Sequence, residues 1–147
     1  VEVQSGASET PEMVQRVGAE ISMGNPREAL EIISHVVPTT AEVIDVSIIR
    51  SDLHLQVDEH DDALAALDHA ISHEPENGLA RLKRGYLYFL LDRLDDAEVD
   101  FEAALEAEPN FVQAWRWRAS VRTLKGNTTG AVDDLEMFRR LCLDGHD

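Results

Sequence analysis

The chain has 147 residues, a formal net charge of −16, 44% hydrophobic residues and a single cysteine. The apolar content excludes a disordered chain, and the excess of acid excludes general nucleic-acid binding, which neutralises phosphates with lysine and arginine. One cysteine excludes an intramolecular disulfide, and no apolar run approaches the ~18 residues that span a bilayer. We expect no direct membrane insertion. The compartment stays open: a soluble, cytoplasmic location is favoured, and an exported or processed chain is the alternative.

Prolines and N-cap residues mark the first elements. After a loose tail at residues 1–9, Thr10 followed by Pro11 predicts the start of a first helix, and Asn25 followed by Pro26 predicts the start of a second. Further prolines separate the segments that follow, because the residue before a proline is pushed out of helical geometry: Pro38, Pro75 and Pro109.

The later segments show the same helical pattern. Apolar residues recur at three and four places within residues 78–91, which is helical rather than strand spacing: Leu79, Leu82, Tyr86, Leu87 and Leu90. A further helix is expected at residues 111–125. Because a turn interrupts the pattern in each stretch of 34 residues, each stretch is expected to form two helices.

A fixed period organises the chain. Four alanines stand 34 residues apart: Ala29, Ala63, Ala97 and Ala131. Within the third copy, small, aromatic and proline residues stand at the spacing of the tetratricopeptide pattern: Gly85, Tyr88, Ala97, Phe101, Ala104 and Pro109. The chain therefore resembles the tetratricopeptide repeat (TPR) family.

The resemblance implies an all-α fold, a right-handed superhelix of four TPR-like antiparallel helix pairs. It places a single domain at residues 10–145, with repeats at about 10–43, 44–77, 78–111 and 112–145. Because one helix pair cannot bury its own apolar face, stability is expected to come from stacking of neighbouring copies.

Charge divides unevenly along the chain. Residues 1–80 carry a formal charge of −13, whereas residues 81–147 carry −3. The first helices of copies three and four contain bases and no acid: Arg81, Lys83, Arg84, Arg116, Arg118, Arg122 and Lys125. In the TPR arrangement this predicts a locally cationic inner wall.

Two of these arginines have a structural interpretation. Arg84 stands sixteen residues before Asp100, and Arg118 sixteen before Asp134, so each helix pair can form an internal ion pair. We favour this role over a site. Arg16 and Arg50 lack the matching aspartate, and either another acid or the groove could receive them.

The TPR resemblance also implies a concave peptide-binding groove on the first helices. We select eight candidates for it: Leu79, Leu82, Lys83, Tyr86, Phe89, Arg116, Trp117 and Ser120. Gln113 occupies another groove position of the fourth copy. For the leucines, packing in the core is the favoured alternative. Aromatic residues flanked by Lys83 and Arg116 predict a protein or peptide partner with acidic residues.

Catalysis and metal binding are not expected. His69 and His73 stand four residues apart, but Ala70 occupies the place of the glutamate of a metalloprotease motif. No glycine-rich phosphate loop is present, so we expect no enzyme and no cofactor. The lysine and asparagine clamp with which some TPR domains hold chaperone carboxylates is also rejected, because only Lys83 fits it.

Two hypotheses for function remain. The first is a non-catalytic scaffold or adaptor, co-chaperone-like, that binds a peptide or helical segment in the groove. The second is a self-association module that forms homo-oligomers through uncovered terminal helices, with Leu135, Phe138 and Leu141 as candidates. The N-terminal face, with Val14, Val17 and Ile21, is another surface that self-association could use. The identity of the partner cannot be obtained from the sequence.

Overall fold

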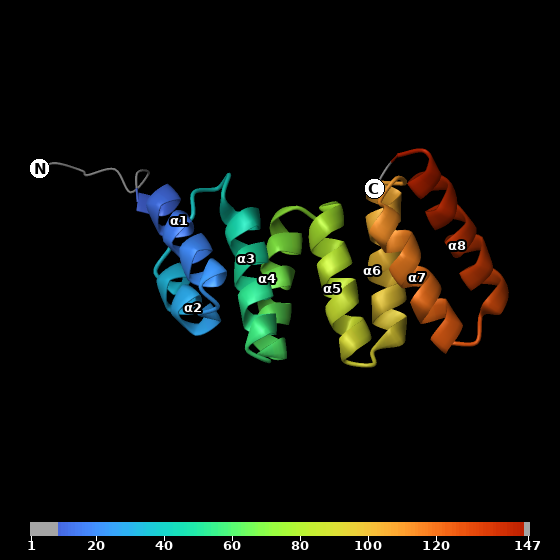
Figure 1. Ribbon diagram of the computed structural model, residues 1–147, viewed down its shortest axis with the longest axis horizontal. Helices are drawn as coiled ribbons and strands as arrows, with labels where there is room; N and C mark the ends of the chain where they lie inside the picture. Colours follow the sequence, from blue (N-terminus) through green and yellow to red (C-terminus); the bar gives the residue numbers. More distant parts are fainter. Residues whose placement is uncertain (1–8, 146–147) are drawn as a thin grey trace, which may run out of the picture. The chain divides into compact units, whose positions relative to one another are not determined.

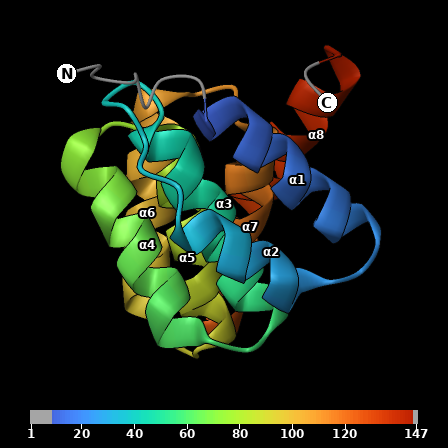
Figure 2. The same ribbon diagram turned by 90° about the vertical axis from the view of Figure 1, so that its left-hand side faces the viewer.

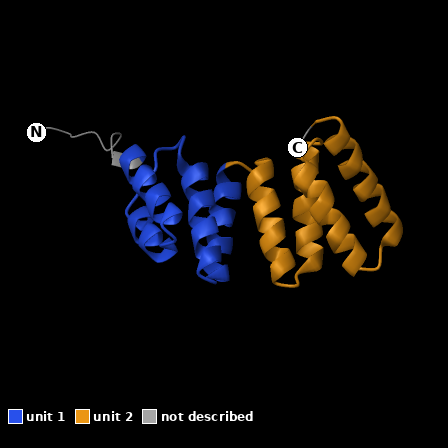
Figure 3. Cartoon of the chain, viewed as in Figure 1, with its two compact units in different colours: residues 1–73 blue, residues 74–147 orange. Residues whose placement is uncertain are grey.

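The computed structural model describes residues 9–145, which form α-helices joined by short connections, with no strand in that range (Figure 1). Contacts group the chain into two compact units, residues 1–73 and residues 74–147 (Figure 3). The sequence predicts one domain at residues 10–145. Of the predicted tail, only Glu9 lies within the described residues, where it begins the first helix.

Unit 1 contains two helix pairs. Its helices are α1 (Glu9–Ser22), α2 (Pro26–Ser34), α3 (Val43–Gln56) and α4 (His60–His73). The helices α1 and α2 pack together, as do α3 and α4, and α2 also contacts α3 (Figure 2). Thr10 lies inside α1 rather than at its N-cap. Pro11 then falls in the first turn of the helix, where a proline is tolerated. The start of α2 at Pro26 is as predicted.

Unit 2 has the same plan. Its helices are α5 (Gly78–Leu90), α6 (Leu94–Ala107), α7 (Val112–Leu124) and α8 (Thr128–Leu143). The pairs are α5 with α6 and α7 with α8, and α6 contacts α7. Each helix pair falls in one 34-residue copy to within one residue, and the predicted all-α fold of TPR-like helix pairs is confirmed.

The repeated alanines lie inside these pairs. Ala29, Ala63 and Ala97 are fully buried, and Ala131 is nearly so. In unit 2, Ala97 packs in a core built around Phe101. A methyl group lets antiparallel helices approach, which a larger side chain would prevent.

A small residue is also needed at Gly85. A Cβ atom there would lie 2.8 Å from Cε1 of Phe101, closer than packed carbon atoms can approach. The close contact of α5 with α6 at this point explains why the repeat pattern has glycine at this position.

The turn inside each helix pair repeats with the period of the sequence. A residue with positive φ occurs at four places 34 residues apart: Gly24, Asp58, Asp92 and Gly126. In each turn the next amide donates to the carbonyl five residues earlier, as Glu59 N does to His54 O at 2.9 Å. This is the Schellman arrangement, which ends a helix by satisfying its last carbonyls. The four turns therefore share one backbone geometry.

Among the helices of the described part, none is long and apolar enough to cross a membrane.

Candidate functional site

A pocket of about 190 Å³ lies where the two first helices of unit 2, α5 and α7, contact each other. It is lined by four residues of α5 and two of α7: Leu79, Leu82, Lys83, Tyr86, Gln113 and Trp117. All six stand at groove positions that the TPR resemblance indicates. Within unit 2, the antiparallel pairs place the first helices α5 and α7 in contact, and this juxtaposition forms the pocket.

Trp117 forms an aromatic wall of the pocket. Its ring lies 4.7 Å from that of Tyr86 and 5.4 Å from that of Phe89, measured between centroids, with tilts of 54° and 55°. Tilted pairs at this separation are a favoured arrangement of aromatic rings. The three half-buried rings hold one another in place, so the pocket wall is pre-organised.

Exposure separates the aliphatic candidates. Leu79 is 42% exposed at the pocket, whereas Leu82 is buried in the core beside Ala97 and Phe101. Leu82 therefore forms the floor of the pocket, and its main role is packing, as the core alternative for the leucines predicts.

The remaining candidates lie beside the pocket. The guanidinium of Arg116 is exposed, 5.7 Å from the centroid of the Trp117 ring. Phe89 supports Trp117 from outside the lining, and the hydroxyl of Ser120 donates to the carbonyl of Arg116 at 3.2 Å. Ser120 thus belongs to α7 itself rather than to the pocket.

The predicted ion pairs have bidentate geometry. Arg84 donates from Nε and Nη2 to Asp100 at 2.7 and 2.8 Å, and Arg118 donates to Asp134 at 3.0 and 2.7 Å. Both carboxylates are buried. Each also accepts from a second arginine, Asp100 from Arg81 at 3.1 Å and Asp134 from Arg122 at 3.0 Å. These clusters join the first helix of each pair to the second.

Carboxylates also engage bases that the sequence assigns to the inner wall. Arg122 donates to Glu98 at 3.0 Å, and Lys125 contacts Glu98 and Asp95 at 2.6 and 2.7 Å. At least five of the seven bases counted on the two first helices therefore pair with acids: Arg81, Arg84, Arg118, Arg122 and Lys125. The locally cationic wall predicted from the sequence is largely neutralised, because acids of the second helices lie within reach of it.

Glu98 is the acid most affected by this network. Burial raises the pKa of Glu98, but hydrogen bonds from Lys125 and Arg122 outweigh it and hold the pKa below its usual value. The pKa of Lys125 is raised by its bonds to Asp95 and Glu98. The network ties α7 to α6.

Arg50 resolves one of the open alternatives. Its Nη2 donates to the carbonyl oxygens of Ile33 and Val36 at 3.0 and 2.9 Å. Arg50 thus binds the C-terminal end of α2 rather than an acid or the groove. A cation at a helix C-terminus also interacts favourably with the helix dipole. Arg16 is exposed on α1.

The last helix exposes apolar residues, though not the full set predicted. Leu135 is 48% exposed and Phe138 is half-buried, whereas Leu141 is buried and contributes to packing within unit 2. Val132 and Leu143, which the prediction did not include, are 57% and 74% exposed.

The histidine pair on α4 makes local contacts. The Nδ1 atom of His69 lies 3.0 Å from the hydroxyl of Ser47, and Nδ1 of His73 lies 3.0 Å from the carbonyl of His69. The two rings lie 4.6 Å apart. These bonds attach both imidazoles to their own helix pair.

The repeated antiparallel pairs and their shared turn define a helical-repeat protein. The sequence model of the tetratricopeptide repeat family matches residues 54–121. The chain also superposes on the crystal structure of MamA with a TM-score of 0.83, at 21% identity, over 94% of this chain and 82% of that one. The resemblance to the TPR family stated from the sequence is confirmed.

Two further groups of similar proteins extend the comparison. Protein O-mannosyl-transferase TMTC1 of Mus musculus is 27% identical over 83% of this chain, and the tetratricopeptide repeat and J domain-containing co-chaperone DNJ1 of Fusarium oxysporum is 33% identical over 56%. The matches span only 13% and 16% of these relatives' own lengths. The second TPR of Spaghetti (RPAP3), bound to the HSP90 peptide SRMEEVD, superposes with a TM-score of 0.65, at 20% identity, over 69% of this chain and 94% of that one.

Proposed function

We propose that the chain is a non-catalytic scaffold that binds a peptide or helical segment of a partner protein on the first helices of unit 2. The observation that carries the proposal is the pocket between α5 and α7, walled by Tyr86 and Trp117. Aromatic residues in pre-formed pockets are where binding energy concentrates in protein interfaces. The RPAP3 domain lends support, since it has the same fold as this chain and is bound to a peptide.

The size of the pocket favours one side chain of a larger partner. At about 190 Å³ it lies below the roughly 300–1,000 Å³ of small-molecule sites. An apolar side chain of the partner would contact Leu79 and the ring of Trp117. The rest of the partner would then extend across the exposed surface of α5 and α7.

Charge next to the pocket suggests what flanks that side chain. Lys83 lines the pocket and Arg116 stands on its aromatic wall. An acidic residue beside the apolar anchor would meet these bases. Because the carboxylate clamp is absent apart from Lys83, we propose an internal acidic residue rather than a terminal carboxylate as the recognised group.

Selection of peptides from a random displayed library against the full chain tests this function. Recovered peptides are expected to combine an apolar residue with a nearby acid, and a labelled peptide gives the affinity by fluorescence anisotropy. The double variant Tyr86→Ala, Arg116→Glu should weaken binding at least about tenfold, the loss of one anchor residue. The charge reversal Arg139→Glu on the exposed surface of α8 is the matched control and should leave affinity unchanged.

The proposal fails if the folded double variant binds the selected peptides as the parent does, or if they share no apolar and acidic residues. Far-UV circular dichroism establishes that the variant is folded. Capture of partners from the source lysate with both proteins would then supply the name of a partner that the parent retains and the variant loses.

Self-association through α8 is a second candidate, favoured by the exposed apolar residues Val132, Leu135 and Leu143. Sedimentation equilibrium over a wide range of concentrations tests it. A parent mass that rises with concentration, and a Leu135→Glu variant that stays monomeric, would support it; a monomeric parent at all concentrations would exclude it.

A further inference from the structure

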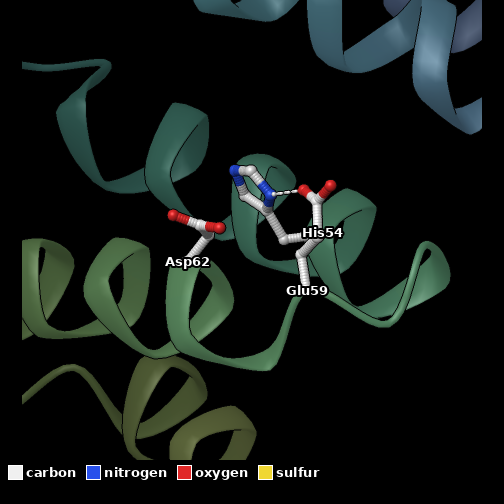
Figure 4. A group of neighbouring side chains, drawn as sticks. All are labelled: His54, Glu59 and Asp62. Carbon is white, nitrogen blue, oxygen red and sulfur yellow. Dashed lines mark hydrogen bonds and ion pairs between the residues drawn. The ribbon is translucent and has the colours of Figure 1, made fainter.

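Three side chains able to bind a metal meet at the turn between α3 and α4 (Figure 4). His54 stands in the last turn of α3, Glu59 in the connection, and Asp62 in the first turn of α4. One ligand atom from each lies within 4.8 Å of those from the other two. Nδ1 of His54 lies 2.8 Å from a carboxylate oxygen of Glu59.

The backbone of the turn holds these positions together. The carbonyl of His54 accepts from the amides of Val57 and Glu59 at 3.2 and 2.9 Å, and Asp58 between them has φ of 62°. His54 and Glu59 are thus fixed as neighbours by the Schellman arrangement before their side chains interact. The geometry is a property of the repeat.

The other copies show that the repeat brings the same positions into contact. In copy one, Asn25 donates to Glu20 at 3.0 Å, and in copy three the guanidinium of Arg93 lies 4.4 Å from the ring of Tyr88. The sets equivalent to His54, Glu59 and Asp62 differ in chemistry: Glu20, Asn25 and Glu28 in copy one; Tyr88, Arg93 and Asp96 in copy three; Arg122, Asn127 and Gly130 in copy four. An imidazole and two carboxylates come together only in copy two.

The surroundings favour a cation. Residues 1–80 carry a formal charge of −13, which raises the local concentration of cations. Two bases lie near the cluster, Arg27 and Arg50. The guanidinium of Arg50 is held by the carbonyl oxygens of Ile33 and Val36. The side chain of Arg27 is 78% exposed and 3.9 Å from Glu59. An exposed pair at this distance contributes little, so Arg27 can move aside at small cost.

We propose that His54, Glu59 and Asp62 bind a divalent transition-metal ion of the zinc class. One nitrogen and two oxygen donors suit zinc and its neighbours, whereas calcium and magnesium prefer oxygen alone. The metal would take the place of the hydrogen bond between His54 and Glu59, and the exposed carboxylate of Asp62 has room to turn inward. Water completes the coordination shell. This inference is independent of the pocket in unit 2.

The consequence for unit 1 is a link between the end of α3 and the start of α4. Because the folded chain presents the three ligands together and the unfolded chain does not, bound metal adds to the free energy of unfolding. The site would therefore act as a metal-dependent staple of the second helix pair.

Isothermal titration calorimetry of the metal-free full chain with Zn²⁺ tests the site. We expect one ion per chain, and at least about tenfold weaker binding in each of His54→Gln and Asp62→Asn. The glutamine of the first variant can still hydrogen-bond to Glu59, and Asp62 is exposed, so both variants should fold. The control His69→Gln removes one of the two neighbouring histidines of α4, His69 and His73, and should leave the affinity for Zn²⁺ unchanged.

A second measurement is the midpoint of thermal unfolding. Zn²⁺ should raise it in the parent and not in His54→Gln, and Mg²⁺ should raise it in neither. The proposal is overturned if the parent binds no zinc, if His54→Gln and Asp62→Asn bind as the parent does, or if His69→Gln alone abolishes binding. In those cases the bond from His54 to Glu59 only closes the turn, as Asn25 does with Glu20.

Discussion

Asp92 holds a backbone conformation that suits glycine better. Its φ is 58°, in the left-handed region, at the end of α5. A Cβ atom raises the energy of this conformation, and a carboxylate at a helix C-terminus opposes the helix dipole. Asp92 and Asp58 occupy the turn position that glycine fills in copies one and four, so they are places where the chain has not reached its most stable sequence.

Asp92→Gly should raise the free energy of unfolding by roughly 0.5–1 kcal/mol. Urea unfolding followed by circular dichroism measures the change through the midpoint at constant slope. Gly126→Ala is the converse control, with φ of 79° at the equivalent place, and should lose about 1 kcal/mol. A less stable Asp92→Gly would show that the aspartate side chain makes a stabilising contact.

Residue spacing predicted part of the site and missed part. The sixteen-residue offset placed Arg84 opposite Asp100 because two antiparallel helices with a short turn fix that register. The cluster at His54 was missed, since its members stand on two helices and in the turn between them, and only a Schellman turn brings them together. Searching for histidine pairs on one helix finds His69 and His73 instead.

At the scale of elements, buried carboxylates hold each pair of unit 2 together. Asp134 is buried on α8 and accepts bonds from Arg118 and Arg122 of α7. Removing one partner from such a cluster leaves uncompensated charge in a poorly solvated place. The pairing of α7 with α8 depends on this residue.

Asp134→Ala should lower the free energy of unfolding by about 3–5 kcal/mol. Its neighbour Asp133 is exposed on the same helix, and Asp133→Ala should change stability by no more than about 0.5 kcal/mol. Urea unfolding of the two variants side by side makes the comparison. Equal effects of both substitutions would show that the buried cluster contributes nothing specific.

The network at Glu98 makes the contact of α6 with α7 sensitive to acid. A carboxyl whose pKa is lowered by folding stabilises the protein above its unfolded value, here 4.5, and this contribution is lost as the pH falls through the folded value. Glu98→Gln should therefore cost about 1–3 kcal/mol at pH 7, and the difference from the parent should shrink below pH 4.5.

Unfolding in urea at several pH values measures this dependence. Glu106→Gln, an exposed acid of the same helix, is the control and should track the parent throughout. A deficit of Glu98→Gln that persists unchanged into acid would mean that the loss comes from packing rather than charge.

The elements themselves could be predicted because their signals are local. A period of 34, the prolines and the apolar spacing sufficed for the helix pairs and for the first helices of unit 2. The charge of the inner wall could not be predicted from composition, since it depends on which acids of the neighbouring helix reach Arg122 and Lys125. Peptide binding at the pocket stays a prediction.

At the scale of the whole molecule, the two units carry different kinds of interaction. The buried arginine and aspartate clusters and both tryptophans, Trp115 and Trp117, belong to unit 2. In a chain of repeats, regions can open with different free energies. Optical probes therefore report on different parts of the chain.

Tryptophan fluorescence should show a transition at higher urea than far-UV circular dichroism, because fluorescence reports on unit 2 and dichroism on all helices. The larger aromatic core around Phe101 is the reason for this order. The comparison uses one sample and both probes. Coincident curves would mean that the chain unfolds in a single cooperative step.

The turn shared by the four copies allows the side chains at that turn to be substituted independently in each copy. Its geometry is set by the backbone, so the three side chains that meet there are free to differ from copy to copy without altering the helices. Duplication thus supplies four equivalent places, each open to a separate chemistry. The substitutions Glu20→His and Asn25→Glu in copy one, together with Glu28, would then create a second metal site in the same protein.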